Sequence, residues 1–488
     1  MAMNAGRREF LKGTAWMGAA AVAAGCCTER FGFGLGGAMQ GFAMRPMKRV
    51  RVGVVGVGGR GLGAVHRLTM VPGVDVVALC DKKPERVDLG LNWFRENKLP
   101  IPAAYVGPER YKALCERDDL DVVYIATNWE MHAPIGLYAL RNGKVTFIEV
   151  PSAMTLDDCW EFVETSEKFR IPCMQLENCV YGEIELLELN LVRSGVLGEI
   201  VHAEGAYIHD LRGLNQTAQM WGEVEWRYAE NRDHKGNRYP THGLVPLCLA
   251  MDINRGDRFD YLVSLESTNA NSELYKEEHL PKGHPRLAEN AAMGDMNTTL
   301  VKTLLGKSIM VQHDVASPRP YSRIQLITGT KGAVGDYPFR VGWEDKNGTG
   351  VHKWFDAKRT EEVRAKYAHP LWKKVGEIAK KVGGHGGMDF IMDLRWAYCL
   401  QNGLPLDMDV YDLAATCSLV ELTEKSVRSG SKPQSVPDFT RGNWRYAQQF
   451  GIMDIDMSKV DLSLAKHDDA ALDTSARLPG AKKGAKKN

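Results

Sequence analysis

The chain has 488 residues, which is too long for a single hydrophobic core and predicts two or three domains. Its 62 Lys and Arg residues nearly balance 61 Asp and Glu residues, so no overall charge favours nucleic acid or a strongly charged partner. No apolar stretch of about 18 residues follows the N-terminal region, which excludes a membrane span in the mature chain. Ten cysteines without a C-x-x-C pair argue against a zinc module or a dense disulfide framework.

Residues 1–27 predict a twin-arginine export signal. Arg7 and Arg8 precede a short stretch of small apolar residues at 14–25. Two processing events fit this stretch: cleavage before Cys26, which would leave a lipid anchor there, or ordinary Ala-x-Ala cleavage. We therefore expect export to the periplasm, either as a free protein or as a membrane-anchored lipoprotein. The alternative is an amphipathic helix that stays on the protein, but the segment has no acidic face. Residues 28–47 are rich in glycine and predict a linker.

A dinucleotide-binding motif comes next. Residues 50–55 form an apolar, β-branched run, typical of a strand buried on both faces of a parallel sheet. The run leads into Gly-x-Gly-x-x-Gly, and residues 62–70 predict the helix that begins there. Glycines at these places allow a tight turn, close approach to a pyrophosphate and packing of the helix on the strand. The free N–H groups at the helix start favour phosphate. The three glycines are Gly56, Gly58 and Gly61.

A carboxylate follows at the expected distance. A second apolar strand at 74–79 leads to Asp81, about twenty residues past Gly61. An acid at this place hydrogen-bonds the adenosine ribose and repels a 2′-phosphate, which favours NAD over NADP. Because strand, glycines, helix, second strand and acid agree, we interpret the motif as an NAD site rather than a glycine turn without a ligand.

Further buried strands at 121–127 and 144–150 continue this pattern, so residues 48–175 predict a Rossmann domain. At this point the sequence resembles the sugar oxidoreductases that include glucose–fructose oxidoreductase and inositol dehydrogenase. In that family the last of these strands usually ends in Glu-Lys-Pro, and the lysine assists catalysis. This chain has Glu149-Val150-Pro151 instead. A valine cannot transfer a proton, which argues against the usual dehydrogenase assignment.

The pattern changes after residue 171, and residues 176–465 predict a second α/β domain that binds the substrate. Residues 200–209 alternate as a strand with Tyr207 and His209 on one face. Two helices, predicted at 388–402 and 410–429, are expected to pack back on the first domain. Residues 466–488 predict a polar, basic tail in solvent.

His242 is the candidate acid–base residue, because an imidazole titrates near neutral pH. Tyr239 lies three residues before it and is its candidate partner. The alternative is a histidine that only caps or packs the start of a helix. No histidine pair has the spacing of a helical zinc site, so we expect no metal.

Several segments together resemble the NAD-dependent glycosidases of glycoside hydrolase family 109, known as α-N-acetylgalactosaminidases. The resemblance covers roughly residues 48–465, and Val150 is the form that this group carries. It implies an N-terminal Rossmann domain followed by a C-terminal α/β domain with a large, mostly antiparallel sheet. The matching segments are 149–151, 177–179, 204–212, 239–243, 254–261, 317–321 and 383–390.

The resemblance implies hydrolysis of terminal α-N-acetylgalactosamine residues with retention. NAD oxidises the sugar hydroxyl at carbon 3, a base removes the acidified proton at carbon 2, and the glycosidic oxygen leaves by elimination. Water then adds and the hydride returns. A tightly bound, recycled NAD suits a protein exported in its folded state, because no free pool awaits it outside. The implied partner is a glycan or small glycoside, and we expect a homo-oligomer that binds no nucleic acid.

The resemblance also implies roles for individual residues. Those implied to bind NAD are Gly59, Arg60, Asp81, Trp129, Glu130, Met131, His132, Glu149, Val150, Asn178 and Tyr239. Those implied to contact the sugar are Tyr207, Arg227, Tyr239, Pro240, Thr241, His242 and Tyr321. Two alternative functions remain open: an NAD-dependent sugar or inositol dehydrogenase, and a non-catalytic sugar-binding protein on the same fold.

Overall fold

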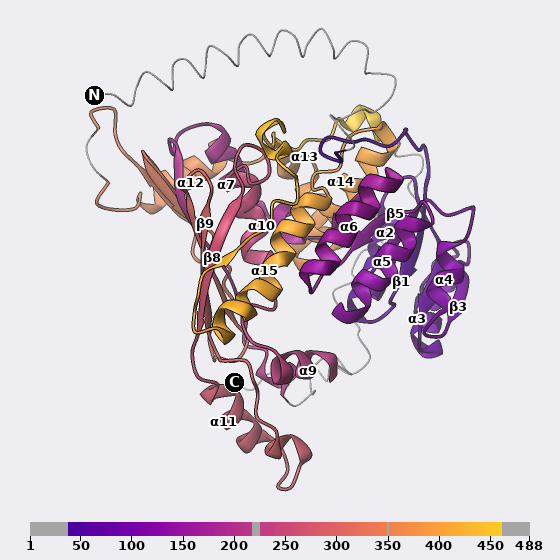
Figure 1. The fold of residues 1–488 in the computed structure, drawn as a ribbon. Coiled ribbons are helices and arrows are strands. Elements are labelled where there is room, and N and C mark those ends of the chain that lie inside the picture. Colours follow the sequence, from indigo (N-terminus) through magenta and orange to yellow (C-terminus); the bar gives the residue numbers. More distant parts are fainter. Residues whose placement is uncertain (1–37, 217–224, 349–350, 461–488) are drawn as a thin grey trace, which may run out of the picture.

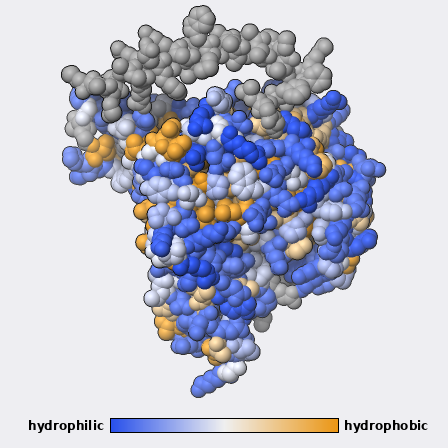
Figure 2. Space-filling view, in the orientation of Figure 1, coloured by the Kyte–Doolittle hydropathy of each residue, from blue (hydrophilic) through white to orange (hydrophobic). Residues whose placement is uncertain are grey.

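The computed structural model describes residues 38–216, 225–348 and 351–460 (Figure 1). The predicted export signal, the first part of the predicted linker and the predicted basic tail lie outside these residues. Among the helices of the described residues, none combines the length and the apolar character needed to cross a bilayer. Figure 2 shows that hydrophilic residues cover most of one face of the molecule, with hydrophobic residues in smaller patches.

The first domain is a parallel sheet with the strand order β3-β2-β1-β4-β5-β6. This order confirms the predicted Rossmann domain. The chain reverses direction across the sheet between β1 and β4, and the ends of these two strands therefore frame the crevice for a dinucleotide. The strands are β1 (Val50–Val55), β2 (Val74–Asp81), β3 (Ala103–Val106), β4 (Val122–Ile125), β5 (Val145–Ile148) and β6 (Cys173–Gln175). The helices are α2 (Gly59–Met70), α3 (Pro84–Glu96), α4 (Arg110–Cys115), α5 (His132–Arg141) and α6 (Leu156–Phe169).

The second domain is built on a mostly antiparallel sheet with the order β13-β12-β11-β7-β10-β9-β8-β14, which confirms the expected architecture. Only β7 and β10 run parallel among the strand pairs of the described residues in this sheet. The strands are β7 (Ile200–Ile208), β8 (Phe259–Glu266), β9 (Asn297–Thr303), β10 (Ser308–Asp314), β11 (Leu326–Gly329), β12 (Gly332–Gly335), β13 (Arg340–Trp343) and β14 (Gln434–Ser435). The helices are α7 (Glu183–Arg193), α8 (Arg212–Asn215), α9 (Glu225–Asp233), α10 (Thr241–Ala250), α11 (Ala270–His279), α12 (Ala357–Tyr367), α13 (Pro370–Val382), α14 (Met388–Asn402) and α15 (Val410–Arg428).

Helices α14 and α15 join the two domains. Helix α14 lies against α2 and β1, whereas α15 packs on α6 of the first domain and on β8 of the second (Figure 1). The prediction that these two helices return to the first domain is confirmed. Both are buried around most of their circumference, as expected for a helix between two layers. One hydrophobic core therefore runs through both domains.

The described end of the predicted linker, residues 38–47, packs against this body. Met39 is buried, and its backbone N–H donates to the hydroxyl of Tyr411 at 3.1 Å. The guanidinium of Arg170 lies over the ring of Phe42 and donates to the carbonyl of Ala38. This segment therefore belongs to the folded part of the chain.

A backbone contact places α10 on β7 and so positions the residues of the site. A Cβ atom on Gly243 would lie 2.2 Å from the backbone nitrogen of Ala206, and a Cβ atom on Gly205 would lie 2.1 Å from the carbonyl oxygen of Gly243. Only glycine on both elements permits this approach. As a consequence His242, in the first turn of α10, faces Tyr207 of β7 at 5.4 Å between ring centroids.

We expect Gly243→Ala to force α10 away from β7. The added methyl group meets backbone atoms that cannot rotate aside, so the free energy of unfolding should fall by about 1–3 kcal/mol. Chemical denaturation followed by circular dichroism measures this change. Gly451→Ala is the control, because a Cβ atom at Gly451 meets open space and the residue has no positive φ. Equal stabilities of the two variants would contradict the proposed contact.

Candidate active site

The end of β1 forms a cradle for a pyrophosphate. Gly56 has a φ of +88°, and a Cβ atom on Gly61 would lie 1.8 Å from the carbonyl oxygen of Gly56. Cβ atoms on Gly58 and Gly59 would instead meet open space. Helix α2 begins at Gly59, so its first N–H groups border this space. Two of the four positions thus require glycine, and the other two leave open space beside the backbone. Both features fit a bound dinucleotide.

Asp81 completes the cradle at the end of β2. Its carboxylate accepts the N–H of Val57 at 2.8 Å and that of Lys83 at 3.0 Å, one on each oxygen. Each oxygen keeps a second lone pair, which can accept a ribose hydroxyl. The residues present therefore fit NAD.

Four further residues predicted to bind the cofactor follow β4. Trp129 is buried in a short 3₁₀ turn (Trp129–Met131), Glu130 is exposed and Met131 is half-buried. His132 is buried, with Nδ1 2.8 Å from the carbonyl of Pro151 and Nε2 3.2 Å from that of Thr127. Burial lowers the pKa of His132 to about 4. The ring of His132 therefore ties two loops together, and its nitrogens face backbone carbonyls.

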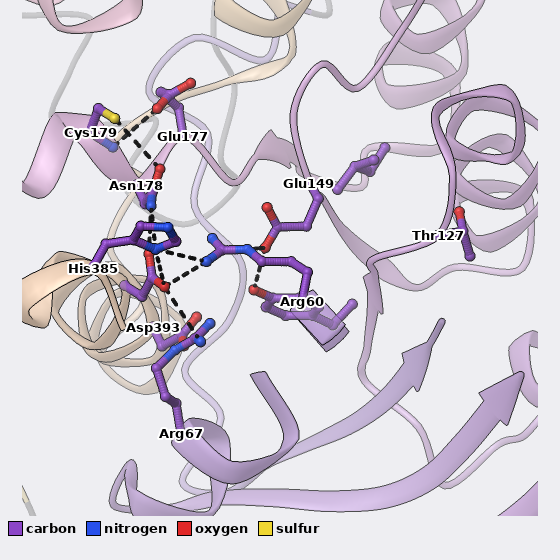
Figure 3. Close-up of polar contacts among 12 residues, drawn as sticks. Arg60, Arg67, Thr127, Glu149, Glu177, Asn178, Cys179, His385 and Asp393 are labelled. Atoms are coloured by element: carbon purple, nitrogen blue, oxygen red, sulfur yellow. Dashed lines mark hydrogen bonds and ion pairs between the residues drawn. The ribbon is translucent and has the colours of Figure 1, made fainter. Parts of the chain in front are cut away.

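Arg60 connects the cradle to α14 (Figure 3). Its Nε donates to Glu149 at 2.7 Å, and its Nη1 donates to Asp389 at 2.5 Å. Arg67, farther along α2, donates to Asp393 at 2.9 Å and lies 3.5 Å from Asp389. Burial alone would raise the pKa of Asp389, but the two guanidinium groups hold it well below its usual range. Burial raises the pKa of Asp393 to about 6.

Asn178 and His385 join the same network (Figure 3). Asn178 donates to Asp389 at 2.5 Å, and Nδ1 of His385 lies 2.9 Å from the other oxygen of that carboxylate. His385 lies in a loop, residues 383–387, whose four glycines all have positive φ. The sequence contained this Gly-Gly-His-Gly-Gly pattern, yet the roles of His385 and Asp389 were not predicted from it. Asp389 is the residue through which this loop, Arg60 and Asn178 meet.

His242 lies between a carboxylate and a phenol. Its Nδ1 is 2.7 Å from Oε1 of Glu177, and its Nε2 is 3.3 Å from the hydroxyl of Tyr239. Glu177 is fully buried. Burial would raise the pKa of Glu177, but the neighbouring imidazole and the N–H of Cys179 hold it below its usual value. Burial also raises the pKa of Tyr239 well above the ordinary value. The predicted pair of His242 and Tyr239 is in hydrogen-bonding contact, and Glu177 is a third member that was not predicted.

Glu177, Cys179 and His242 also form the one group in the described residues whose ligand atoms lie close enough to share a metal ion. Two of these ligand atoms, on Glu177 and His242, contact each other directly. Two ligands of a tetrahedral zinc ion lie roughly 3.3 Å apart, because each bond measures about 2.0–2.1 Å. The observed 2.7 Å is a direct hydrogen bond instead.

Aromatic rings cluster beside His242. Tyr207 lies 4.7 Å from Tyr239 and 6.2 Å from Tyr321 between ring centroids, and its hydroxyl is 3.2 Å from Nδ1 of His209. Burial raises the pKa of Tyr207 to about 12. The hydroxyl of Tyr321 accepts a hydrogen bond from Arg323 at 2.9 Å. His209 was not predicted as a site residue, although its alternation with Tyr207 placed both on one face.

This aromatic cluster adjoins the cofactor domain. Trp129 stacks on Tyr239 at 5.4 Å and meets Trp226 at 4.8 Å. The guanidinium of Arg227 lies over both tryptophan rings. Five predicted sugar-contacting residues are thus near one another: Tyr207, Arg227, Tyr239, His242 and Tyr321. Pro240 and Thr241 are buried at the start of α10.

Two family models match the chain. The model of the glycosyl hydrolase 109 C-terminal domain matches residues 181–446, which is more than half of the sequence. The chain belongs to glycosyl hydrolase family 109. A model of the oxidoreductase family with an NAD-binding Rossmann fold matches residues 50–174. The predicted family and the NAD-binding Rossmann domain are therefore confirmed.

Two similar proteins carry the name of the same family. Glycosyl hydrolase family 109 protein 1 of Bacteroides thetaiotaomicron is 47% identical over 416 residues, which cover 83% of this chain and 87% of that protein. The family 109 protein of Solibacter usitatus is 43% identical over 451 residues, covering 91% and 98% of the two chains.

Solved structures show the same fold at low identity. A levoglucosan dehydrogenase in complex with NADH and levoglucosan has a TM-score of 0.61 at 17% identity, covering 80% of this chain and 100% of that one. The scyllo-inositol dehydrogenase of Lactobacillus casei, with bound NAD(H) and scyllo-inositol, has a TM-score of 0.55 at 12% identity, covering 80% and 99%. Family 109 membership and the cofactor domain together support an NAD-dependent glycoside hydrolase on a fold shared with sugar dehydrogenases.

Asp389→Asn should weaken the contact between α14 and the cofactor domain. Removing one partner of a buried ionic network leaves uncompensated charge on Arg60 and Arg67, so we expect a loss of about 3–5 kcal/mol at neutral pH. The pKa of Asp389 is lower in the folded protein than in the unfolded chain. The ionised carboxylate therefore stabilises the fold above the ordinary carboxyl pKa of about 3.9, and this stabilisation is lost as the pH falls toward the folded-state pKa. Urea unfolding of both proteins should therefore show a gap that narrows below about pH 4.

Asp88→Asn is the control for this measurement, because Asp88 is exposed on α3. It should leave the free energy of unfolding within about 0.5 kcal/mol. A gap between Asp389→Asn and the unmodified protein that stays constant into acid would refute the assigned role of the carboxylate.

Proposed function

We propose that this chain hydrolyses terminal α-N-acetylgalactosamine residues with retention, and that it keeps its NAD tightly bound through the cycle. One observation carries the proposal: His242 is hydrogen-bonded to Tyr239, whose ring stacks on Trp129 at the edge of the cofactor domain. An acid–base pair thus lies where a sugar can contact both the pair and the cofactor domain. Bound NAD supplies a reversible hydride acceptor for the sugar hydroxyl at carbon 3. The cradle at Gly56–Gly61 and Asp81 would hold it.

His242 and Tyr239 supply the proton transfers. Nε2 of His242 takes the proton from carbon 2 once a ketone at carbon 3 has acidified it, and the glycosidic oxygen leaves by elimination. Water then adds to carbon 1 and a proton returns to carbon 2. Return of the stored hydride to carbon 3 would turn the ketone back into the hydroxyl and complete hydrolysis with retention. Because burial raises the pKa of Tyr239 well above its usual value, its hydroxyl keeps its proton near neutral pH and donates a hydrogen bond. Tyr207, Arg227 and Tyr321 orient the sugar.

The carboxylates near the pocket argue against a conventional glycosidase. That mechanism requires two carboxyl groups facing the scissile bond. Glu177 is fully buried on His242, and Glu149 accepts hydrogen bonds from Arg60 and the hydroxyl of Tyr124. Because both carboxylates are already bound by other side chains, the site favours a mechanism that uses positioned proton donors and acceptors rather than a carboxyl pair.

One position distinguishes the proposed glycosidase from a net dehydrogenase: Val150, where the dehydrogenases usually carry a lysine. Val150 is 4% exposed and offers no proton-transferring group. This observation favours the glycosidase over a net dehydrogenase. Export by the twin-arginine route is part of the same proposal, since a recycled cofactor needs no external supply.

The activity test uses the purified protein and a nitrophenyl α-N-acetylgalactosaminide without any added redox partner. We expect release of nitrophenol, and in heavy water we expect deuterium at carbon 2 of the released sugar by mass spectrometry. Cleavage without exchange would defeat the elimination mechanism. Net accumulation of NADH with a free sugar would favour the dehydrogenase. A panel of α- and β-linked nitrophenyl glycosides tests the sugar specificity.

His242→Ala should lower turnover by ~10²–10⁴-fold, the usual contribution of a positioned acid–base group. Folding and NAD content should stay near those of the unmodified protein, because the first domain provides the cradle. Asp81→Ala is the matched comparison and should lose NAD while the pocket keeps its shape. Near-normal turnover by His242→Ala would move the catalytic role to one of the tyrosines.

A further inference from the structure

The contact between Glu177 and His242 joins the two domains at the site. Glu177 follows β6 in the first domain, whereas His242 opens α10 in the second. Oε1 of Glu177 accepts the backbone N–H of Cys179 at 3.0 Å and lies 2.7 Å from Nδ1 of His242. The backbone bond fixes the carboxylate in the short 3₁₀ turn (Asn178–Tyr181) that follows it. The imidazole thus meets a carboxylate that is itself held in place.

This arrangement selects one tautomer of the neutral imidazole. A carboxylate only accepts hydrogen bonds, so Nδ1 must carry the ring proton that points at Glu177. Nε2 then carries the lone pair and faces the hydroxyl of Tyr239 at 3.3 Å. The nitrogen on the pocket side is therefore the proton acceptor. When Nε2 gains a proton, the imidazolium faces a negative charge at hydrogen-bonding distance.

The carboxylate of Glu177 is fully buried. Its Oε1 takes both hydrogen bonds, from the N–H of Cys179 and from Nδ1 of His242. The hydroxyl of Thr241 also acts on this carboxylate and helps to hold its pKa below the usual value. A fully buried carboxylate with its charge directed at one imidazole fits a group that acts on that imidazole.

We propose that Glu177 is a positioning residue that holds His242 in the tautomer with the proton on Nδ1. This inference rests on the proposed function, in which Nε2 of His242 is the base. Glu177 does not touch the sugar, because it is fully buried behind the imidazole.

Glu177→Gln tests the proposal with almost no change in volume. The amide oxygen keeps the place of Oε1, because the N–H of Cys179 needs an acceptor there, and it still accepts Nδ1–H. The negative charge that stabilises the protonated imidazole is lost. We expect kcat to fall by up to ~10²–10⁴-fold, the range that a positioned acid–base group contributes, because protonation of Nε2 becomes less favourable. KM, NAD content and melting temperature should change little, and deuterium exchange at carbon 2 should fall with kcat.

Glu188→Gln is the matched control. Glu188 is also buried, and burial raises the pKa of its carboxyl well above the usual value, so an amide resembles the form already present. This variant should keep kcat within about twofold. If Glu177→Gln lowered stability and raised KM but had no specific effect on kcat, Glu177 would have only a structural role. That result would overturn the proposal.

A spectroscopic measurement on the unmodified protein gives a second test that needs no variant. With ¹⁵N-labelled histidine, the resonances of His242, assigned by their loss in His242→Ala, should show a protonated Nδ1 and an unprotonated Nε2. A proton on Nε2 in the neutral ring would overturn the proposal even if the glycosidase activity is found. The expected tautomer without any glycosidase activity would instead leave the positioning intact and refute the proposed function.

Discussion

Buried ion pairs between the cofactor domain and α14 hold the site together. Arg60 extends directly from the glycine turn, and its bond to Asp389 fixes the start of α2 against α14. Asn178 binds the same carboxylate, and the next residue toward the N-terminus is Glu177, which holds His242. A chain of direct contacts therefore runs from the glycine cradle to His242, the candidate acid–base residue. Displacing α14 would disturb both ends.

The fold and the cofactor site could be predicted because their signals are local. The alternation of apolar residues, the glycine spacing and the position of Asp81 each depend on a short window of sequence. The close packing of Gly56 and Gly61 repeats the steric argument from the motif. A Rossmann turn is thus encoded by neighbouring residues, and its geometry follows from their sizes.

The remaining parts of the site depend on contacts between distant segments. Glu177 and His242 are 65 residues apart, and Arg60 and Asp389 are 329 residues apart. No periodicity or spacing marks such pairs, because their meeting is decided by how the two domains pack. His385 was visible only as a residue within a glycine-rich loop. The tyrosine cluster was predicted in outline from the resemblance, whereas His209 and Trp226 needed the structure.

The distribution of charge has a chemical consequence. Carboxylates near His242 pair with arginines or with His242 itself, so the side chains around the imidazole are mainly aromatic rings with phenol hydroxyls. Among buried rings a hydrogen bond to a charged group is stronger than in water. Glu177 lies in the first domain and His242 in the second. The orientation of the His242 ring therefore depends on the same domain contact that adjoins the cofactor cradle, so loss of this contact should misorient the ring as well as open the cradle.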